Sequence, residues 1–452
     1  MNRLYKYSWL LILILSVSFS FCKKYLDVKS DKSLVVPTSL YDLQALLDND
    51  LIMNNKAPAF SQACVDDIFL TTEKFNAQPE FHRQVYIWQI PPYSSGNDWG
   101  AAYNAVYYAN YCMEQLDEIP KNGTTMSEWS NIKGSAHFYR GYYFLWLLWE
   151  YAKSYDSATA DADLGIVLRL NSDFNIPSVR SSVRESYKQV IEDLMEASYY
   201  LPVVSLHPSR PSKPAAYGAL SRCYLSMNQY DSAYKYANLC LEFKSDLLDY
   251  NSTEVNKVST TPFQRFNKEI VFYTAQSANY AIKLSRNSFQ DTALYDTYAP
   301  DDLRKICFFF KNGNYYSFKG HYTSNLNLFF NGISTSEILL IRSEANARMG
   351  RVSEAMNDLN HLLIHRWVSG SFIPLTAESQ EEALNIVLLE RRKELTMRGL
   401  RWMDIKRLNR LGSEINLIRI LDGQEYKMPP NDNRFALPLP DDVIRLTGMP
   451  QN

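Results

Sequence analysis

The sequence contains little glycine, and its cysteines are not arranged in pairs. Glycine supplies 16 of the 452 residues, which argues against a β-architecture built on glycine-rich turns and favours long helices. The six cysteines are widely spaced and form no C-x-x-C motif, so the sequence predicts neither a zinc site nor a disulfide framework. We therefore expect free, buried thiols. The formal net charge is only −2, and the absence of a large basic patch argues against nucleic-acid binding.

Motifs of several enzyme and cofactor-binding classes are also absent. The sequence has no G-x-S-x-G, no phosphate-binding P-loop and no G-x-G-x-x-G. His361 and His365 share one helical face, but no glutamate follows His361 and no third ligand is evident. Asp161 and Asp163 lack the further oxygen ligands of a calcium loop. We expect no metal site and no cofactor.

The N-terminus has the pattern of an exported lipoprotein. Residues 1–8 include two basic and no acidic side chains, and the apolar run Trp9–Phe21 is shorter than the roughly 20 residues that span a bilayer. Cys22 follows directly. We predict that residues 1–21 are a lipoprotein signal peptide and that Cys22 is the lipidation site. The alternative is a plain signal peptide that ends near Ser20, with Cys22 as an ordinary thiol.

Aromatic residues are abundant, with 32 tyrosines, 22 phenylalanines and 8 tryptophans. Most of these rings must fill a core between helices. Apolar residues at helical spacing predict helices over 99–120, 128–156 and 182–202. The middle helix is apolar on nearly all sides, so we expect it to be central and buried, and it is too short for a membrane span.

Two segments repeat one pattern. Residues 217–241 align without gaps on 339–363, and each predicts a helix, a short turn and a second helix. This is typical of tetratricopeptide repeats, whose stacked hairpins bury a shared face. We predict a mainly α fold: tetratricopeptide-like helical hairpins forming a superhelical scaffold, with long irregular loop insertions and a few short strands. The expected parts of the mature chain, 22–452, are an N-terminal helical part (22–210), the hairpins (211–243 and 337–366), a loop-rich insertion (244–336) and C-terminal helices with a tail (367–452).

Two irregular tracts combine rings with polar side chains, as a sugar-binding site requires. Sugars present apolar faces that stack on rings, while their hydroxyls need polar partners, and loops on a rigid scaffold often hold such sites. The candidate ligand residues are Asp67, Arg83, Trp88, Tyr93, Asn97 and Trp99 in the stretch 65–100, and Tyr315, Tyr316, His321 and Tyr322 in the stretch 311–327. For each ring, burial in the core is the competing interpretation. Trp99 in particular can begin a helix and pack inward.

The densest group of charges lies in residues 390–407. Glu390 and Asp404 could form an acid/base pair, but the neighbouring arginines would keep both carboxylates ionised, which suits a general acid badly. Asp404 can instead reach Arg401 or Lys406. We interpret the stretch as an ion-pair network that locks the last helices to the repeats, and we expect no enzyme.

Several motifs, taken in order along the chain, resemble the SusD/RagB-like family of outer-membrane lipoproteins. They are CKKYLDVKSD, WGAAYNAVYYAN, KGSAHFYRGYYFLWLLWEYAKSYD, LGIVLRLN followed by YKQVIEDLMEASYYLP, ISTSEILLIRSEANARMG, LLERRKELTMRGLRWMDIKR and ALPLPDDVIRLTGMPQN. The matches run from Cys22 to Asn452, and jointly they are more specific than any one alone. Arg398 departs from the pattern, since the family usually has glutamate before the residue that is Gly399 here.

The resemblance implies a helical protein with tetratricopeptide repeats, anchored by lipid to the outer membrane and exposed at the cell surface. Such a protein would sit as a lid over a SusC-like TonB-dependent transporter and capture oligosaccharides, or peptides in some members, without catalysing a reaction. Two alternatives stay open. One is a peptide-binding lipoprotein of the same uptake type, and the other is a tetratricopeptide scaffold of an envelope complex that faces the periplasm.

Exposure at the cell surface separates the uptake protein from the scaffold. Protease added to intact cells should degrade a surface-exposed protein while a periplasmic marker stays intact, because the outer membrane excludes the protease. Immunoblots of the treated cells measure the outcome. Protection in intact cells, with cleavage after lysis, would favour the periplasmic scaffold.

Overall fold

The protein is described by a computed structural model that covers residues 37, 39–94, 97–121, 123, 125–276 and 286–452. The predicted signal peptide and the lipidation site Cys22 lie outside the described residues. Within the described part of the chain, no helix combines the length and the apolar character that crossing a membrane requires.

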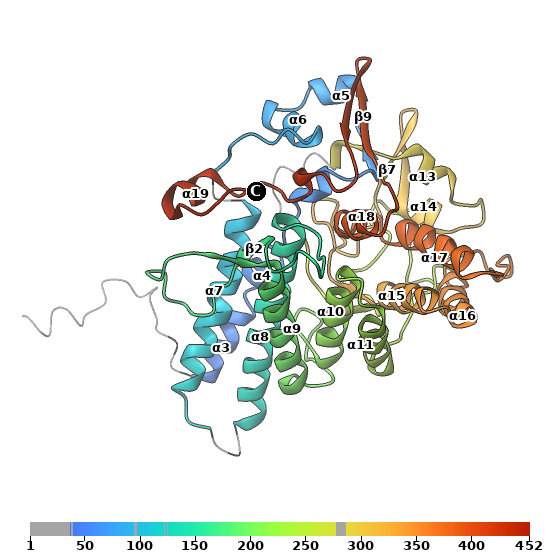
Figure 1. The fold of residues 1–452 in the computed structure, drawn as a ribbon. Helices are drawn as coiled ribbons and strands as arrows, with labels where there is room; N and C mark the ends of the chain where they lie inside the picture. Colours follow the sequence, from blue (N-terminus) through green and yellow to red (C-terminus); the bar gives the residue numbers. More distant parts are fainter. Residues whose placement is uncertain (1–36, 38, 95–96, 122, 124, 277–285) are drawn as a thin grey trace, which may run out of the picture.

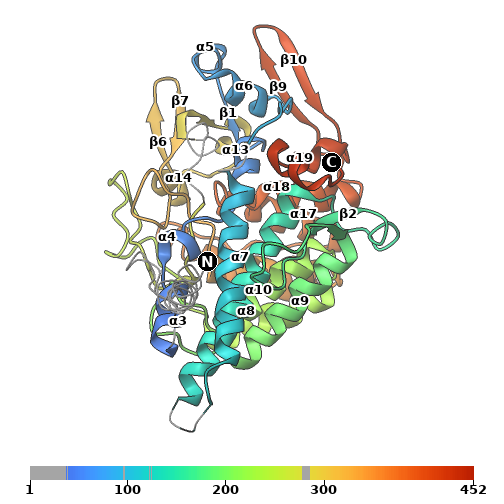
Figure 2. The ribbon, with the colours of Figure 1, turned by 90° about the vertical axis from the view of Figure 1, so that its left-hand side faces the viewer.

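Helices form the body of the molecule, as predicted. The three expected N-terminal helices are α7 (Asp98–Asp117), α8 (Met126–Tyr151) and α9 (Val183–Tyr200). They lie side by side, with the short helices α3 (Leu40–Leu47) and α4 (Asp50–Met53) against them (Figures 1 and 2). Ser39 and Asp42 close a capping box at the start of α3, so a local hydrogen-bond pattern fixes where this helix begins.

The expected central helix is α8. Every residue from Phe138 to Tyr151 is buried. A glycine lets α9 approach closely, since a Cβ at Gly141 would lie only 3.0 Å from the Cβ of Asp193. Arg140 then reaches Asp193 with two hydrogen bonds of 2.8 and 2.6 Å. The apolar surface of α8 is therefore covered by neighbouring helices, which confirms the predicted burial.

The two repeated segments form the predicted helical hairpins. They are α10 (Lys213–Ser226) with α11 (Tyr230–Phe243), and α15 (Thr335–Arg348) with α16 (Val352–Leu363). Each turn places one residue in the left-handed region, Asn228 at φ 58° and Gly350 at φ 76°, where asparagine and glycine are tolerated best. α11 packs against α15, so the hairpins are neighbours although the insertion separates them in the sequence (Figure 1).

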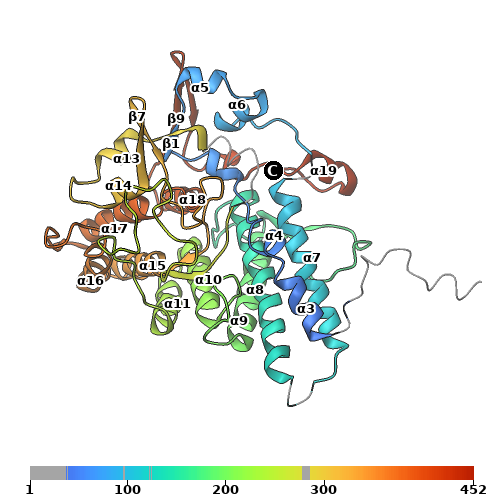
Figure 3. The same cartoon turned by 180° about the vertical axis from the view of Figure 1, so that it is seen from behind.

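The remaining elements are short. In the described part of the chain the strands form antiparallel pairs: β1 (Ile68–Phe69) with β5 (Phe289–Gln290), β2 (Leu164–Val167) with β3 (Arg180–Ser182), β4 (Ile270–Phe272) with β8 (Ile333–Ser334), β6 (Phe309–Asn312) with β7 (Tyr315–Phe318), and β9 (Leu417–Leu421) with β10 (Gln424–Met428). The other helices are η1 (Phe60–Ala63), α5 (Thr72–Asn76), α6 (Glu80–Tyr86), α13 (Thr292–Asp296), α14 (Arg304–Phe308), α17 (Gln380–Glu394), α18 (Arg401–Arg410), η2 (Asn433–Phe435) and α19 (Asp441–Thr447). The elements α5, α6, β6–β7 and β9–β10 gather at one end of the helical body, which we call the loop face (Figures 1 to 3).

The described cysteines are all free and buried: Cys64, Cys112, Cys223, Cys240 and Cys307. Burial raises the pKa of each thiol, to about 12 for Cys112 and for Cys307. The expectation of buried thiols is confirmed for these residues.

The insertion between the hairpins has a hydrophobic core of its own. Tyr250, Phe263, Phe308 and Tyr322 are fully buried there, and their rings pack at centroid distances of 4.9 to 6.1 Å. Irregular backbone and short strands were expected for this tract, and its packing shows that aromatic burial, more than regular secondary structure, holds it together.

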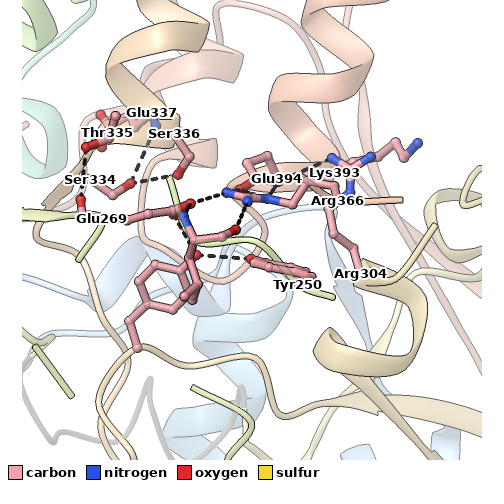
Figure 4. A network of polar contacts seen from close by, with 12 residues as sticks. Tyr250, Glu269, Arg304, Ser334, Thr335, Ser336, Glu337, Arg366, Lys393 and Glu394 are labelled. Atoms are coloured by element: carbon pink, nitrogen blue, oxygen red, sulfur yellow. Dashed lines mark hydrogen bonds and ion pairs between the residues drawn. The ribbon is translucent and has the colours of Figure 1, made fainter. Parts of the chain in front are cut away.

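Buried ion pairs join the insertion to the last helices (Figure 4). Arg366, just after α16, donates to Glu394 at the end of α17 and to Glu269 before β4, at 2.9 and 2.7 Å. Arg304 in α14 pairs with Glu390 and Glu394 of α17 at 2.6 and 3.3 Å. Burial alone would raise the pKa of the Glu394 carboxyl, but Arg366 and Arg304 hold it below its ordinary value. The predicted ion-pair network is present, and it is buried.

The partners of Asp404 differ from the prediction. Its carboxylate accepts hydrogen bonds from Arg391 and Arg407, at 2.9 and 2.8 Å, and the expected pairs with Arg401 or Lys406 are wrong. The turn between α17 and α18 sets this pairing, because it brings Arg391 alongside α18. Burial would raise the pKa of Asp404, but the two arginines lower it, so this carboxylate is held ionised.

Arg366 should be essential for stability. Arg366→Met would leave Glu269 and Glu394 buried with one cation fewer, and we expect the free energy of unfolding to fall by about 3–5 kcal/mol. Chemical denaturation at neutral pH measures this change. Lys188→Met is the surface control, since Lys188 and Glu192 pair at 3.7 Å with side chains 74% and 53% exposed, and we expect little change there. Similar losses in both variants would contradict the role assigned to Arg366.

Candidate functional site

The two tracts that supplied the candidate ligand residues meet on the loop face (Figure 2). β1 of the first tract pairs with β5, placing Ile68 opposite Gln290 and Phe69 opposite Phe289. The β6–β7 hairpin of the second tract packs over this pair, since the ring of Tyr315 lies 5.0 Å from Phe69 and 4.9 Å from Phe289. A short strand pair and a ring cluster thus bring residues distant in the sequence into one surface.

A depression lies beside this junction, and we call it the loop-face pocket. It has a volume of about 180 Å³ and is lined by Ile68, Arg286, Ser288, Gln290, Phe310, Phe318, His321, Leu326, Phe329 and Met397. Typical small-molecule sites have roughly 300–1,000 Å³. A pocket of this size would hold one end or one ring of a longer ligand, with the remainder lying on the rim.

The walls of the pocket are aromatic. Phe310 is 44% exposed, which leaves its ring accessible to a ligand. His321 is buried and lies flat against Phe329, with ring centroids 4.1 Å apart. Burial and the positive charge of Arg398 lower the pKa of His321 to about 3, so the imidazole is neutral at ordinary pH. This histidine therefore adds no charge to the pocket wall, and Phe310 is the lining ring that is exposed.

Polar groups of the pocket come from β5 and the residues before it. Gln290 is 2% exposed, and its Nε2 has no hydrogen-bond partner among the described residues. Its Oε1 is the weak acceptor of the Thr396 hydroxyl, at 3.5 Å. Arg286 is exposed. Aromatic rings can stack on the apolar faces of a sugar, and hydrogen-bond donors without a partner can bind its oxygens.

Tyr315 and Tyr316 of the candidate set lie on opposite faces of the β6–β7 hairpin, because side chains alternate along a strand. Tyr316 stacks on Tyr295 of α13 with ring centroids 3.9 Å apart and an angle of 14°. Both candidate tyrosines are half-buried. They remain ring surfaces near the pocket, one on each side of the hairpin.

Three candidates of the first tract have structural partners. Asp67 is buried and pairs with Arg392 at 3.0 Å. Asn97 caps α7, where its side chain accepts a hydrogen bond from the backbone of Trp99. Arg83 is half-buried and donates to a backbone carbonyl at 3.4 Å. Asp67 and Asn97 are thus occupied in holding the loop face on the helices.

Trp88 and Tyr93 are also engaged by backbone. Trp88 is 3% exposed, and its Nε1–H donates to the carbonyl of Cys64 at 2.9 Å. The hydroxyl of Tyr93 donates to the carbonyl of Pro438 at 2.5 Å. Tyr93 is half-buried, whereas the Trp88 side chain is almost fully enclosed.

Trp99 begins α7 and packs inward, as its competing interpretation held. Its ring lies 4.8 Å from Tyr103 and 5.1 Å from Tyr151. It lines a second hollow of about 300 Å³, shared with Tyr107, Phe174 and Leu446 among others. This apolar hollow is separate from the loop-face pocket, so the structure does not bring Trp99 together with His321.

Tyr322 is fully buried in the core of the insertion. Its hydroxyl donates to Glu269 at 2.8 Å and contacts the hydroxyl of Tyr250 at 3.0 Å. It supports the pocket from behind and does not line it. His361 and His365 have ring centroids 5.8 Å apart, and among the described residues no group of three metal-ligating side chains is present.

Of the ten lining residues only His321 was a sequence candidate, and the nine that were missed include Arg286, Gln290 and Phe310. Phe310 ends the run Phe308-Phe309-Phe310 directly before the second candidate stretch, and that run was a usable signal. Gln290 lies opposite Ile68 in the sheet, and only the pairing of β1 with β5 reveals its position.

Comparison with known proteins agrees with this architecture. Residues 24–225 match a family described as starch-binding and associating with the outer membrane, and residues 210–444 match the SusD family. The SusD-like protein P2 of Formosa agariphila is 38% identical over 122 residues, which are 26% of this chain and 24% of that protein.

Solved structures share the fold. A SusD superfamily protein from Bacteroides thetaiotaomicron matches with a TM-score of 0.74 at 19% identity, covering 92% of this chain and 99% of the other. A SusD-like carbohydrate binding protein from Bacteroides vulgatus matches with a TM-score of 0.68 at 20% identity, covering 91% and 97%. The predicted mainly helical fold class is confirmed.

The enclosed ring of Trp88 should act on stability. Trp88→Ala removes a buried indole and the hydrogen bond to Cys64, and we expect the free energy of unfolding to fall by about 3–5 kcal/mol. Urea unfolding followed by circular dichroism measures it. Tyr199→Ala is the control, because this ring is 76% exposed on α9. A Trp88→Ala protein as stable as the control would show that the indole contributes little to the core.

Proposed function

The chain belongs to the SusD family, whose members bind starch or other carbohydrates and associate with the outer membrane, and we propose that it captures oligosaccharides there. The captured ligand would pass to a SusC-like TonB-dependent transporter, over which the protein would sit as a lid. In this proposal Cys22 holds the protein to the membrane through lipid and the loop face receives the ligand.

The loop-face pocket is the observation on which the proposal rests. It combines the accessible ring of Phe310 with the flat His321–Phe329 pair and the free amide of Gln290. Stacking on rings and hydrogen bonding to oxygens are the two interactions that a sugar needs. Tyr315 and Tyr316 extend the aromatic surface beyond the pocket, which suits a ligand of several sugar rings.

The ion pairs of the two acidic residues that were considered for catalysis are consistent with a binding role without catalysis. Glu390 and Asp404, the acid/base pair considered from the sequence, lie in ion pairs with Arg304 and with Arg391 and Arg407. Arg391 and Arg407 lower the pKa of Asp404, and a carboxylate held ionised in this way is a poor general acid. We therefore propose transport as the only consequence of binding.

Calorimetric titration of the full-length protein in neutral detergent tests the proposal. A panel of oligosaccharides and oligopeptides is titrated into the protein and into Phe310→Ala and Tyr316→Ala. Saturable sugar binding that Phe310→Ala weakens about two- to tenfold is the expected result, since stacking on one ring contributes roughly 0.5–1.5 kcal/mol. An effect of Tyr316→Ala would show that the ligand also contacts the other face of the hairpin.

Tyr199→Ala is the matched control, since it removes an exposed tyrosine from α9 on the helical body. It should bind as the unaltered protein does. Binding of peptides alone would replace the sugar proposal with the peptide-uptake alternative. Absence of any binding by a folded protein would contradict ligand capture by the isolated chain.

A further inference from the structure

The loop-face pocket is lined by a cation and by no carboxylate. Arg286 is the single charged residue among its described lining residues. Because Arg286 is exposed, its guanidinium can move to meet a ligand at the mouth. Sites for neutral sugars usually present acceptors as well as donors, since hydroxyls do both. A pocket whose charged group only donates selects for groups that only accept.

A second cation stands beside the same segment. Lys74 of α5 donates to the carbonyl of Asn287 at 2.8 Å, and its ammonium lies 4.2 Å from the centroid of the Phe289 ring. Asn287 is the neighbour of Arg286 in the chain. Two positive charges therefore flank the start of β5.

A third cation lies behind the pocket wall. Arg398 is buried, donates to the hydroxyl of Ser334 at 2.9 Å, and lies over the ring of Tyr322 at 4.2 Å. No ion pair joins it to a carboxylate of the described residues, although the negative charges of Glu394 and Glu269 act on it from farther away, and its Nη2 has no hydrogen-bond partner among them. Its positive field reaches His321 in the wall and helps to keep that imidazole neutral.

The nearby carboxylates are already engaged. Asp67 pairs with Arg392, and Asp291 caps α13 by accepting from the backbone of Leu294. Glu394 is shared by Arg366 and Arg304. Glu73 on α5 is exposed and does not line the pocket, although its charge acts on the neighbouring Lys74. No carboxylate of the described residues therefore lines the pocket beside Arg286, and the acids that act on Lys74 and Arg398 lie outside it.

We propose that the pocket binds an anionic substituent of the sugar, a carboxylate or a sulfate ester, so that the ligand is an acidic oligosaccharide. Arg286 pairs with the anion at the mouth, and the free Nε2 of Gln290 donates to one of its oxygens. Phe310 supports the sugar ring that bears the anion. The inference rests on the proposed capture of oligosaccharides and adds the chemical class of the ligand.

Titrations with matched ligands test the inference. Tetragalacturonate is compared with its methyl ester, and a κ-carrageenan tetrasaccharide with its desulfated form, so that the members of each pair share a sugar backbone and differ at the anionic groups. The full-length protein in neutral detergent should bind a charged member at least tenfold more tightly than its neutral partner, and higher ionic strength should reduce that difference. Which pair responds distinguishes a carboxylate from a sulfate.

Variants locate the anion. Arg286→Ala should weaken binding of the charged ligand roughly ten- to a hundredfold, the range for one hydrogen bond to a charged group, and should leave the neutral partner unaffected. Arg286→Lys should restore part of the loss. Arg351→Ala is the matched control, because Arg351 is exposed at the start of α16, and it should change neither affinity.

The outcomes separate this inference from the proposed function. Equal affinity for charged and neutral partners, or binding of neutral sugars alone, would overturn the acidic ligand while leaving oligosaccharide capture in place. An Arg286→Ala protein that keeps its preference for charged sugars would overturn the role of the pocket. Failure to bind any sugar would contradict capture itself.

Discussion

Arg366 holds together parts of the chain that would otherwise have no fixed relation. It follows the second hairpin, and its guanidinium contacts Glu394 at the end of α17, Glu269 before β4 and the carbonyl of Leu248. Its own carbonyl accepts from the backbone of Leu303. A buried charge with several partners tolerates little displacement, because each displaced partner would be left unpaired in a medium of low dielectric constant. The contacts of Arg366 therefore fix the position of the insertion relative to the repeats.

This docking in turn shapes the ligand surface. The segment from Glu269 leads through β4, and the insertion then returns as β5 to pair with β1. The β6–β7 hairpin closes over that pair through Tyr315. The walls of the loop-face pocket are short strands with few hydrogen bonds of their own, so their positions depend on the core behind them, where Tyr322 is bonded to Glu269. Rigidity at the site is supplied by the buried charges.

The helices and helical hairpins could be predicted from the sequence, because the residue patterns that specify them are local. Spacing of apolar residues set α7, α8 and α9, and the turns at Asn228 and Gly350 lie where the repeat required them. The exposure of individual aromatic side chains could not be predicted, because it depends on partners that are distant in the sequence. Tyr93 donates a hydrogen bond to the carbonyl of Pro438, and Trp88 donates one to the carbonyl of Cys64. Gln290 could be assigned to the site only from the pairing of β5 with β1. The structure brings the two candidate stretches together beside the pocket, whereas the burial of Trp88, Trp99 and Tyr322 was evident only in the packed structure.

The reactivity of the buried thiols depends on local unfolding of the regions that enclose them. Alkylation and oxidation proceed through the thiolate, and burial both raises the pKa of Cys64, Cys112, Cys223, Cys240 and Cys307 and removes them from reagents. Cys64 directly follows η1, and the other four lie in α7, α10, α11 and α14. Local unfolding of any one of these regions would therefore expose a particular cysteine to reagents. Labelling followed by peptide mapping would therefore report which part of the fold opens first, without any label being engineered into the chain.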